Sequence, residues 1–144
     1  MKRISDLLDD KGRSIWSLSP DATVYEAIEQ MALKGVGALL VMEGKQLVGI
    51  VSERDYARKV ILKGKTSQET AVHEIMSHPV ICASPEMTVQ QTMALMTEKR
   101  VRHLPVITDD NVVGVISIGD VVRAIIEDHE FSIQQLTSYI TASG

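Results

Sequence analysis

The stretch Gly49-Ile50-Val51-Ser52-Glu53-Arg54-Asp55 recurs 65 residues later as Gly114-Val115-Ile116-Ser117-Ile118-Gly119-Asp120. In both copies an apolar run leads into Ser-x-x-Asp, which is typical of a strand that ends where a helix begins. The serine and the aspartate could be structural only, as a capping box that satisfies the first N–H groups of the helix. They could also bind a ligand, because a helix start after a glycine offers N–H donors to a phosphate, and an adjacent Asp accepts hydrogen bonds from ribose hydroxyls.

The whole chain is organised around this duplication. The same offset aligns residues 19–61 with residues 84–126 without a gap. Identical pairs include Ser19/Ser84, Pro20/Pro85, Thr23/Thr88, Met31/Met96, Leu39/Leu104, Val41/Val106, Gly49/Gly114, Ser52/Ser117 and Asp55/Asp120. Further upstream, the triplet Ile4, Leu7 and Leu8 matches Val72, Ile75 and Met76 when a three-residue difference is allowed. Self-similarity over this length indicates an internal repeat.

Each copy predicts the element order β-α-β-β-α. An extended segment and a Ser-Pro turn come first, and a helix with apolar residues at spacings of three and four follows over 24–32 and 89–96. Two runs rich in Val, Ile and Leu then predict a hairpin, at 38–42 with 47–51 and at 104–107 with 112–116. A second helix starts near Ser52 or Ser117. The expected fold class is α/β (α+β), with two repeats that share apolar faces, because about 60 residues bury too little surface alone.

The segment limits follow from the repeat. We predict residues 1–62 as repeat one, 63–70 as a polar connector, 71–127 as repeat two and 128–144 as a C-terminal helical tail. Ile133, Leu136 and Ile140 give the tail one apolar face, and the tail has no counterpart in repeat one.

Composition restricts the classes of function. The formal net charge is −4 and the basic residues are scattered, whereas nucleic-acid binders usually carry a basic patch, so we expect no nucleic-acid partner. The single Cys82 permits no internal disulfide, which fits a reducing compartment. The first twelve residues lack the apolar stretch of a signal peptide, and no apolar run approaches the roughly 20 residues that span a bilayer. We therefore expect a soluble, cytoplasmic protein with no membrane partner.

Together with the Ser-Pro openings and the segment Val101-Arg102-His103-Leu104-Pro105-Val106, the duplicated Gly-h-h-Ser-x-x-Asp junctions resemble a tandem pair of CBS domains, named after cystathionine β-synthase. The resemblance covers nearly the whole chain. It implies a Bateman module, in which two repeats related by a pseudo-twofold axis form two clefts that commonly hold adenosine derivatives. It also implies a homodimer that meets through helices, with the tail as a candidate for extra contacts.

In this family each cleft combines the junction of one repeat with the helix start and first hairpin strand of the other. For the first cleft the resemblance implies Ile50, Ser52, Arg54 and Asp55 with Met87, Thr88, Val101, Arg102 and His103. Asp55 would bind ribose, and the phosphate would face Ser52, Arg54, Arg102 and His103. For the second cleft it implies Val115, Ser117, Gly119 and Asp120 with Ala22, Thr23, Val36, Gly37 and Ala38. Because Gly37 and Ala38 stand where repeat two has Arg102 and His103, we expect the second cleft to lack cationic groups for a phosphate.

These expectations describe a regulatory, signal-transducing module that binds AMP, ADP, ATP or NAD and has no catalytic cofactor. An alternative is a dimerising interaction scaffold that recruits an effector protein, in which Ser-x-x-Asp only caps helices. A small enzyme is a third hypothesis, which we disfavour because no convergent catalytic group is visible. His73 and His78 lack companions at metal-ligand spacing, so we expect no metal site.

Overall fold

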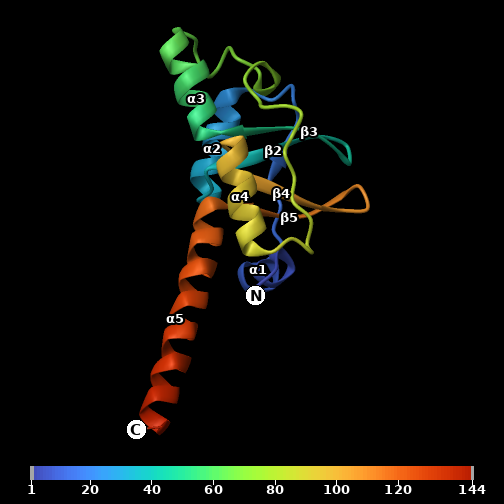
Figure 1. The fold of residues 1–144 in the computed structure, drawn as a ribbon. Helices are drawn as coiled ribbons and strands as arrows, with labels where there is room; N and C mark the ends of the chain where they lie inside the picture. Colours follow the sequence, from blue (N-terminus) through green and yellow to red (C-terminus); the bar gives the residue numbers. More distant parts are fainter. Residues whose placement is uncertain (1, 144) are drawn as a thin grey trace. The chain divides into compact units, whose positions relative to one another are not determined.

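A computed structural model describes residues 2–143, apart from the side chains of a part of the C-terminal helix that includes positions 133, 136 and 140. The chain divides into two compact units (Figure 1). The repeat-one unit is Ile15–Val80. The repeat-two unit joins the N-terminal segment up to Ser14 to the chain from Ile81 onward. The first residues therefore pack with the second copy of the repeat, although they precede the first copy in sequence.

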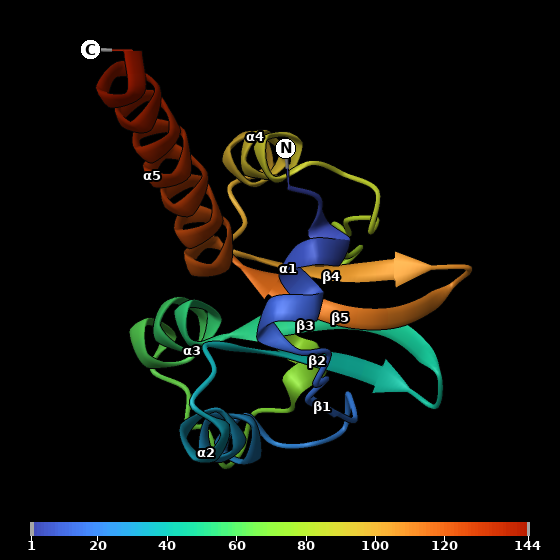
Figure 2. The ribbon, with the colours of Figure 1, turned by 90° about the horizontal axis from the view of Figure 1, so that it is seen from below.

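The repeat-one unit contains a three-stranded sheet with helices beside it. Its elements are β1 (Ser17–Leu18), α2 (Val24–Lys34), β2 (Ala38–Glu43), β3 (Gln46–Ser52), α3 (Glu53–Lys59) and the 3₁₀ turns η1 (Ile61–Lys63) and η2 (Val72–Glu74). β1 runs parallel to β2, and β2 pairs antiparallel with β3. The core is aliphatic, with Val24, Met31, Leu39 and Val51 almost fully buried. Figure 2 shows α2 and α3 next to each other on one side of this hairpin.

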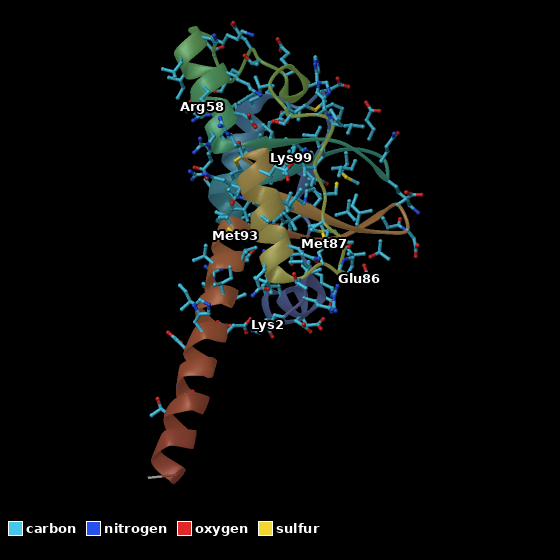
Figure 3. All side chains as sticks on the ribbon, in the orientation of Figure 1. Lys2, Arg58, Glu86, Met87, Met93 and Lys99 are labelled. Atoms are coloured by element: carbon cyan, nitrogen blue, oxygen red, sulfur yellow. The ribbon has the colours of Figure 1, made fainter. Side chains whose placement is uncertain are left out.

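The repeat-two unit has a two-stranded hairpin with helices from both ends of the chain. Its elements are α1 (Ile4–Lys11), α4 (Val89–Lys99), β4 (His103–Thr108), β5 (Asn111–Ser117) and α5 (Ile118–Ser143). A two-residue turn joins the strands, and Asp109 and Asp110 both take positive φ, the conformation that tight hairpins require. Met87, two residues before α4, and Met93 on α4 are partly buried against the core of this unit (Figure 3).

Equivalent glycines in the two hairpins, Gly49 and Gly114, leave room for a side chain from another segment of the same unit. A Cβ on Gly114 would lie 2.6 Å from Leu8 Cδ2, and a Cβ on Gly49 would collide with the Met76 side chain. Leu8 and Met76 are the residues that the shifted alignment equates. The hairpin glycine of each unit is therefore covered in an equivalent way. Leu8 of α1 covers it in the repeat-two unit, and Met76, which follows η2, covers it in the repeat-one unit.

The structure confirms the predicted fold class and places both hairpins at the expected residues. The order β-α-β-β-α is complete in repeat one, whereas in repeat two the expected first strand is reduced to a single bridge between Ala83 and Val106. One helix also differs, because the second helix of repeat two and the tail form a single helix, α5. The reason is local: no Gly or Pro interrupts the sequence from Asp120 to Ser143. The side chains of Ile133, Leu136 and Ile140, named above for an apolar face, lie outside the described part. Among the described residues, no helix is long and apolar enough to cross a membrane.

Candidate functional site

The first junction is a capping box at the start of α3. The Ser52 hydroxyl accepts the Asp55 N–H at 3.2 Å, and the Asp55 carboxylate accepts the Ser52 N–H at 2.9 Å. Lys59, one turn further along α3, places its Nζ 3.2 Å from Asp55 Oδ1. The side chain of Asp55 is 15% exposed, so this carboxylate is reachable from solvent. Arg54, the adjacent residue, is exposed.

The second junction repeats the capping box and adds two cations. The Asp120 carboxylate accepts the Ser117 N–H at 2.8 Å, and the Asp120 N–H is donated to the Ser117 hydroxyl at 3.2 Å. Lys11 Nζ lies 2.7 Å from Asp120 Oδ2, and Arg123 Nη2 lies 2.6 Å from Asp120 Oδ1. The structural interpretation of Ser-x-x-Asp as a helix cap is therefore confirmed at both junctions. A capping role does not exclude binding, since one carboxylate can serve both.

The start of the first hairpin strand lies beside the junction of its own repeat. Ala38 pairs with Ser52, and Gly37 accepts the Glu53 N–H at 3.1 Å. In repeat two, His103 pairs with Ser117, and Arg102 accepts the Ile118 N–H at 2.8 Å. Each unit thus brings together the predicted residues that flank one sheet end.

The helix starts that the sequence analysis selected are also capped. The Thr23 hydroxyl accepts the Glu26 N–H, and the Thr88 hydroxyl accepts the Gln91 N–H, both at 3.1 Å. The neighbouring carbonyls bind other segments: Ala22 accepts the Val72 N–H and Met87 accepts the Ile4 N–H. The two threonines begin α2 and α4, and their hydroxyls are not fully enclosed, because both residues are only partly buried.

The remaining predicted residues sit at the same sheet ends. Val101 is packed against the repeat-two core and Arg102 is exposed. The Ile50 carbonyl accepts the Ser77 N–H at 2.9 Å, whereas the Val115 carbonyl accepts Lys11 Nζ at 2.8 Å. A Cβ on Gly119 would make ordinary van der Waals contacts, at 3.5 Å from Arg123 Nη1 and 3.6 Å from Ser117 Oγ.

Two titratable groups in the repeat-two unit are perturbed. Burial lowers the pKa of His103, and the positive charge of Lys11 lowers it further. For Asp120, burial by itself would raise the pKa, but the hydrogen bonds from Lys11 and from the Ser117 N–H outweigh burial. The pKa of Asp120 therefore lies below its ordinary value. At neutral pH the second junction holds a carboxylate beside a neutral imidazole.

Lys11 and Arg123 are cations that the sequence analysis did not name at the second junction. We expected the second cleft to lack cations because Gly37 and Ala38 replace Arg102 and His103 there, yet two cations lie against Asp120. Lys11 was missed because it is 109 positions away in the chain and belongs to no local motif. Arg123 could have been found from the sequence, since it follows Asp120 by three positions on one helix.

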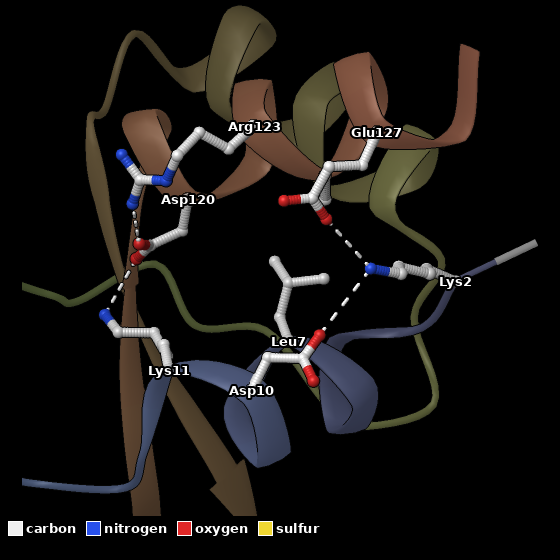
Figure 4. Close-up of a pocket in the computed structure, with 8 residues that line it drawn as sticks. Lys2, Leu7, Asp10, Lys11, Asp120, Arg123 and Glu127 are labelled. Atoms are coloured by element: carbon white, nitrogen blue, oxygen red, sulfur yellow. Dashed lines mark hydrogen bonds and ion pairs between the residues drawn. The ribbon is translucent and has the colours of Figure 1, made fainter. Parts of the chain in front are cut away.

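Each unit also has a hollow next to its candidate residues. The repeat-two unit has a cavity of about 250 Å³. Figure 4 shows Lys2, Asp10 and Glu127 at one side of it and Lys11, Asp120 and Arg123 at the other. In the repeat-one unit, a hollow of about 500 Å³ lies between α2 and α3. It is lined by Ile28, Met31, Ala32, Gly35, Val36, Gly37, Glu53 and Tyr56. Within residues 2–143, no three His, Cys, Asp or Glu side chains are grouped so that they could hold a metal ion.

Comparison with known proteins gives one consistent result. The family profile of the CBS domain matches the chain twice, at residues 5–62 and 72–127. A mitochondrial CBS domain-containing protein of Arabidopsis thaliana is 44% identical over 147 residues, covering 95% of this chain and 71% of that protein. A solved structure of a protein with CBS domains from Burkholderia ambifaria is 46% identical with a TM-score of 0.85, over 88% of this chain and 96% of that one.

A more distant structure has the same fold. It is a CBS domain pair solved in complex with 5′-methylthioadenosine and S-adenosyl-L-methionine, with a TM-score of 0.79 at 23% identity, over 89% of this chain and 98% of that one. The repeat, the two capped junctions and these matches agree. The chain belongs to the CBS domain family and contains a tandem pair of CBS domains.

Proposed function

We propose that this CBS pair is a regulatory sensor that binds adenosine-containing nucleotides, of the AMP, ADP, ATP or NAD type, and that it catalyses no reaction itself. The observation that carries the proposal is the duplicated junction, in which Asp55 and Asp120 are each fixed at a helix start by the serine that ends the preceding strand. A fixed, ionised carboxylate is suited to accept two ribose hydroxyls, and the N–H groups beside it suit a phosphate. The distant CBS pair that holds two adenosine compounds supports the ligand class.

Among the residues that the resemblance assigns to the two clefts, we propose Asp55 and Asp120 as the groups that bind ribose. Arg102 is exposed and presents a guanidinium suited to a phosphate, which supports its assignment to the phosphate end. We propose that the protein is cytoplasmic. Because the plant relative is mitochondrial, cell fractionation should test this location.

A melting scan tests the ligand class. Protein stripped of carried-over ligand is heated with AMP, ADP, ATP, NAD, NADH, S-adenosylmethionine, and GTP as a control. A ligand at about 100 times its Kd stabilises the native state by about 2.7 kcal/mol per site, which shifts the Tm by roughly 5–10 °C for a chain of this size. Shifts limited to adenine compounds support the proposal. No shift with any of them contradicts it and favours the interaction scaffold.

A second feature supports assembly with another copy of this chain. The hollow between α2 and α3 is lined mostly by apolar side chains, and Tyr25, Leu33 and Leu62 expose 47%, 78% and 76% of their surface in the same unit. Exposed apolar surface of this kind marks an interaction site more often than chance. We propose a homodimer through these helices. Sedimentation equilibrium should give twice the chain mass, and Leu33→Glu should reduce it to the monomer, whereas a monomeric wild-type chain contradicts the dimer.

A further inference from the structure

Lys11 holds two candidate ligand-binding groups of repeat two at once. It is the last residue of α1, and its Nζ lies 2.7 Å from Asp120 Oδ2 and 2.8 Å from the Val115 carbonyl oxygen. Both acceptors belong to the second junction, one at the end of β5 and one at the start of α5. Figure 4 shows the Lys11 and Arg123 side chains reaching Asp120 from different elements.

Oδ2 of Asp120 has no acceptor site left for a further partner while Lys11 remains. Oδ2 accepts the Ser117 N–H and Lys11 Nζ, Oδ1 accepts Arg123 Nη2, and only 8% of the side chain is exposed. A ribose that donates its two hydroxyls to the two oxygens of this carboxylate must therefore displace Lys11 from Oδ2, since Oδ1 still has one acceptor site. Arg123 is 68% exposed and can turn into solvent, whereas Lys11 is 37% exposed and also bonds the Val115 carbonyl. Release of Lys11 is thus the costlier change.

The charges at the second junction favour an anionic ligand. Two cations against one carboxylate leave an excess of one positive charge at this end of the cavity. A neutral nucleoside that displaces Lys11 leaves the ammonium without a counter-ion. A ligand with a phosphate close to its ribose gives the ammonium a new partner, and hydrogen bonds between ionised groups are stronger than neutral ones.

Repeat one has a different arrangement. The carbonyl of Ile50, equivalent to that of Val115, accepts the backbone N–H of Ser77. The alignment that equates Leu8 with Met76 places Pro79 at the position of Lys11, and proline has no charge and no N–H. The lysine that reaches Asp55 is Lys59, on the same helix as Asp55. Among the described residues, a lysine from a different helix therefore reaches the junction aspartate in repeat two but not in repeat one.

We propose that Lys11 makes the repeat-two site selective for phosphorylated adenosine compounds. Lys11 neutralises Asp120 in the unliganded protein and transfers to the ligand phosphate when ribose binds Asp120. This inference rests on the proposed function, and it assigns to the second site the preference for phosphate that the sequence alone assigned to the first.

Calorimetric titration of the full chain tests the proposal. The Asp55→Asn background leaves only the repeat-two carboxylate, and AMP and adenosine are titrated into this protein and into its Lys11→Met and Lys11→Arg forms. Lys11→Met should lower the ratio of AMP affinity to adenosine affinity at least tenfold, because adenosine no longer competes with the ammonium and AMP loses a counter-ion. Lys11→Arg should retain most of the ratio, which separates loss of charge from loss of fold.

Lys2→Met is the matched control. Lys2 connects the N-terminal segment to α5 through Glu127 at 3.1 Å, lines the same cavity and does not bind Asp120. This variant should keep the ratio of the Asp55→Asn protein. An unchanged ratio in Lys11→Met, or an equal fall in Lys2→Met, overturns the role of Lys11. If Asp55→Asn binds neither compound while Asp120→Asn binds AMP, the role of Lys11 is overturned and the proposed function stands. If no protein binds either compound, wild type included, both are overturned.

Discussion

At the scale of single residues, the two equivalent aspartates have different surroundings. Asp55 pairs with a lysine on its own helix, and its side chain is 15% exposed. Asp120 binds one cation from α1 and one from α5, and its side chain is 8% exposed. A local sequence pattern could predict the serine and aspartate of each junction, because a capping box involves neighbours along the chain. The pattern could not predict Lys11, because that contact depends on how a distant segment packs.

The Asp120 pairs make the stability of the repeat-two unit depend on pH. The pKa of Asp120 is lowered in the folded protein, so its contribution is complete above the ordinary value of about 3.9 and is lost as the pH falls through the lower folded value. We expect Asp120→Asn to lower the free energy of unfolding by about 2 kcal/mol at pH 7, the scale of hydrogen bonds to charged groups. Urea denaturation should show that the difference from wild type shrinks between pH 5 and pH 3. A difference that is constant over this range contradicts the pKa direction.

At the scale of elements, the predictions that succeeded rest on local patterns. The hairpins follow from alternating runs of Val, Ile and Leu on either side of short polar turns, and both lie where the sequence places them. The tail expected from residue 128 is helical, but it is not a separate helix, because α5 continues from Ile118 to Ser143 without a break. The sequence comparison also equated the segment of α1 with that of η2, although one is an α-helix and the other a single 3₁₀ turn. Equivalent apolar positions therefore do not specify the same backbone.

The contact between α1 and β5 gives a direct test at this scale. Gly114→Ala should lower the free energy of unfolding by about 1–3 kcal/mol, because the added methyl group overlaps Leu8, and insertion into a filled core has this cost. Gly119→Ala is the matched control, since a Cβ there has no atom closer than 3.5 Å. Chemical denaturation of both variants measures the effect. Equal stability of the two variants would show that Leu8 does not pack on Gly114.

At the scale of the whole molecule, the sequence repeats and the compact units are different divisions of the chain. The family profile follows the repeats, at residues 5–62 and 72–127, whereas the repeat-two unit takes its first helix from the N-terminus. Ile4 and Leu8 are fully buried in the core of that unit, and Leu7 is 5% exposed. An alignment of the repeats cannot reveal that α1 packs in the repeat-two unit, because each copy has a similar apolar triplet upstream.

Deletion of residues 1–13 should therefore unfold the repeat-two unit. Three buried aliphatic side chains contribute about 1.5–3 kcal/mol each, and their sum is comparable to the stability of a typical domain. Hydrogen exchange should lose protection in β4, β5 and α4, while β2 and β3 keep theirs. The opposite result, with protection lost in the repeat-one hairpin, would show that the N-terminal helix belongs to the first copy.

We propose that the two junction carboxylates, Asp55 and Asp120, hold adenosine-type ligands. Calorimetric titration of the best nucleotide from the melting scan into wild type, Asp55→Asn, Asp120→Asn and the double variant tests it most directly. Asparagine keeps an oxygen for the capping N–H and removes the charge, so circular dichroism should show that all four proteins are folded. We expect each single variant to lose one class of sites and the folded double variant to bind no ligand. Unchanged affinity in the double variant would contradict the proposal.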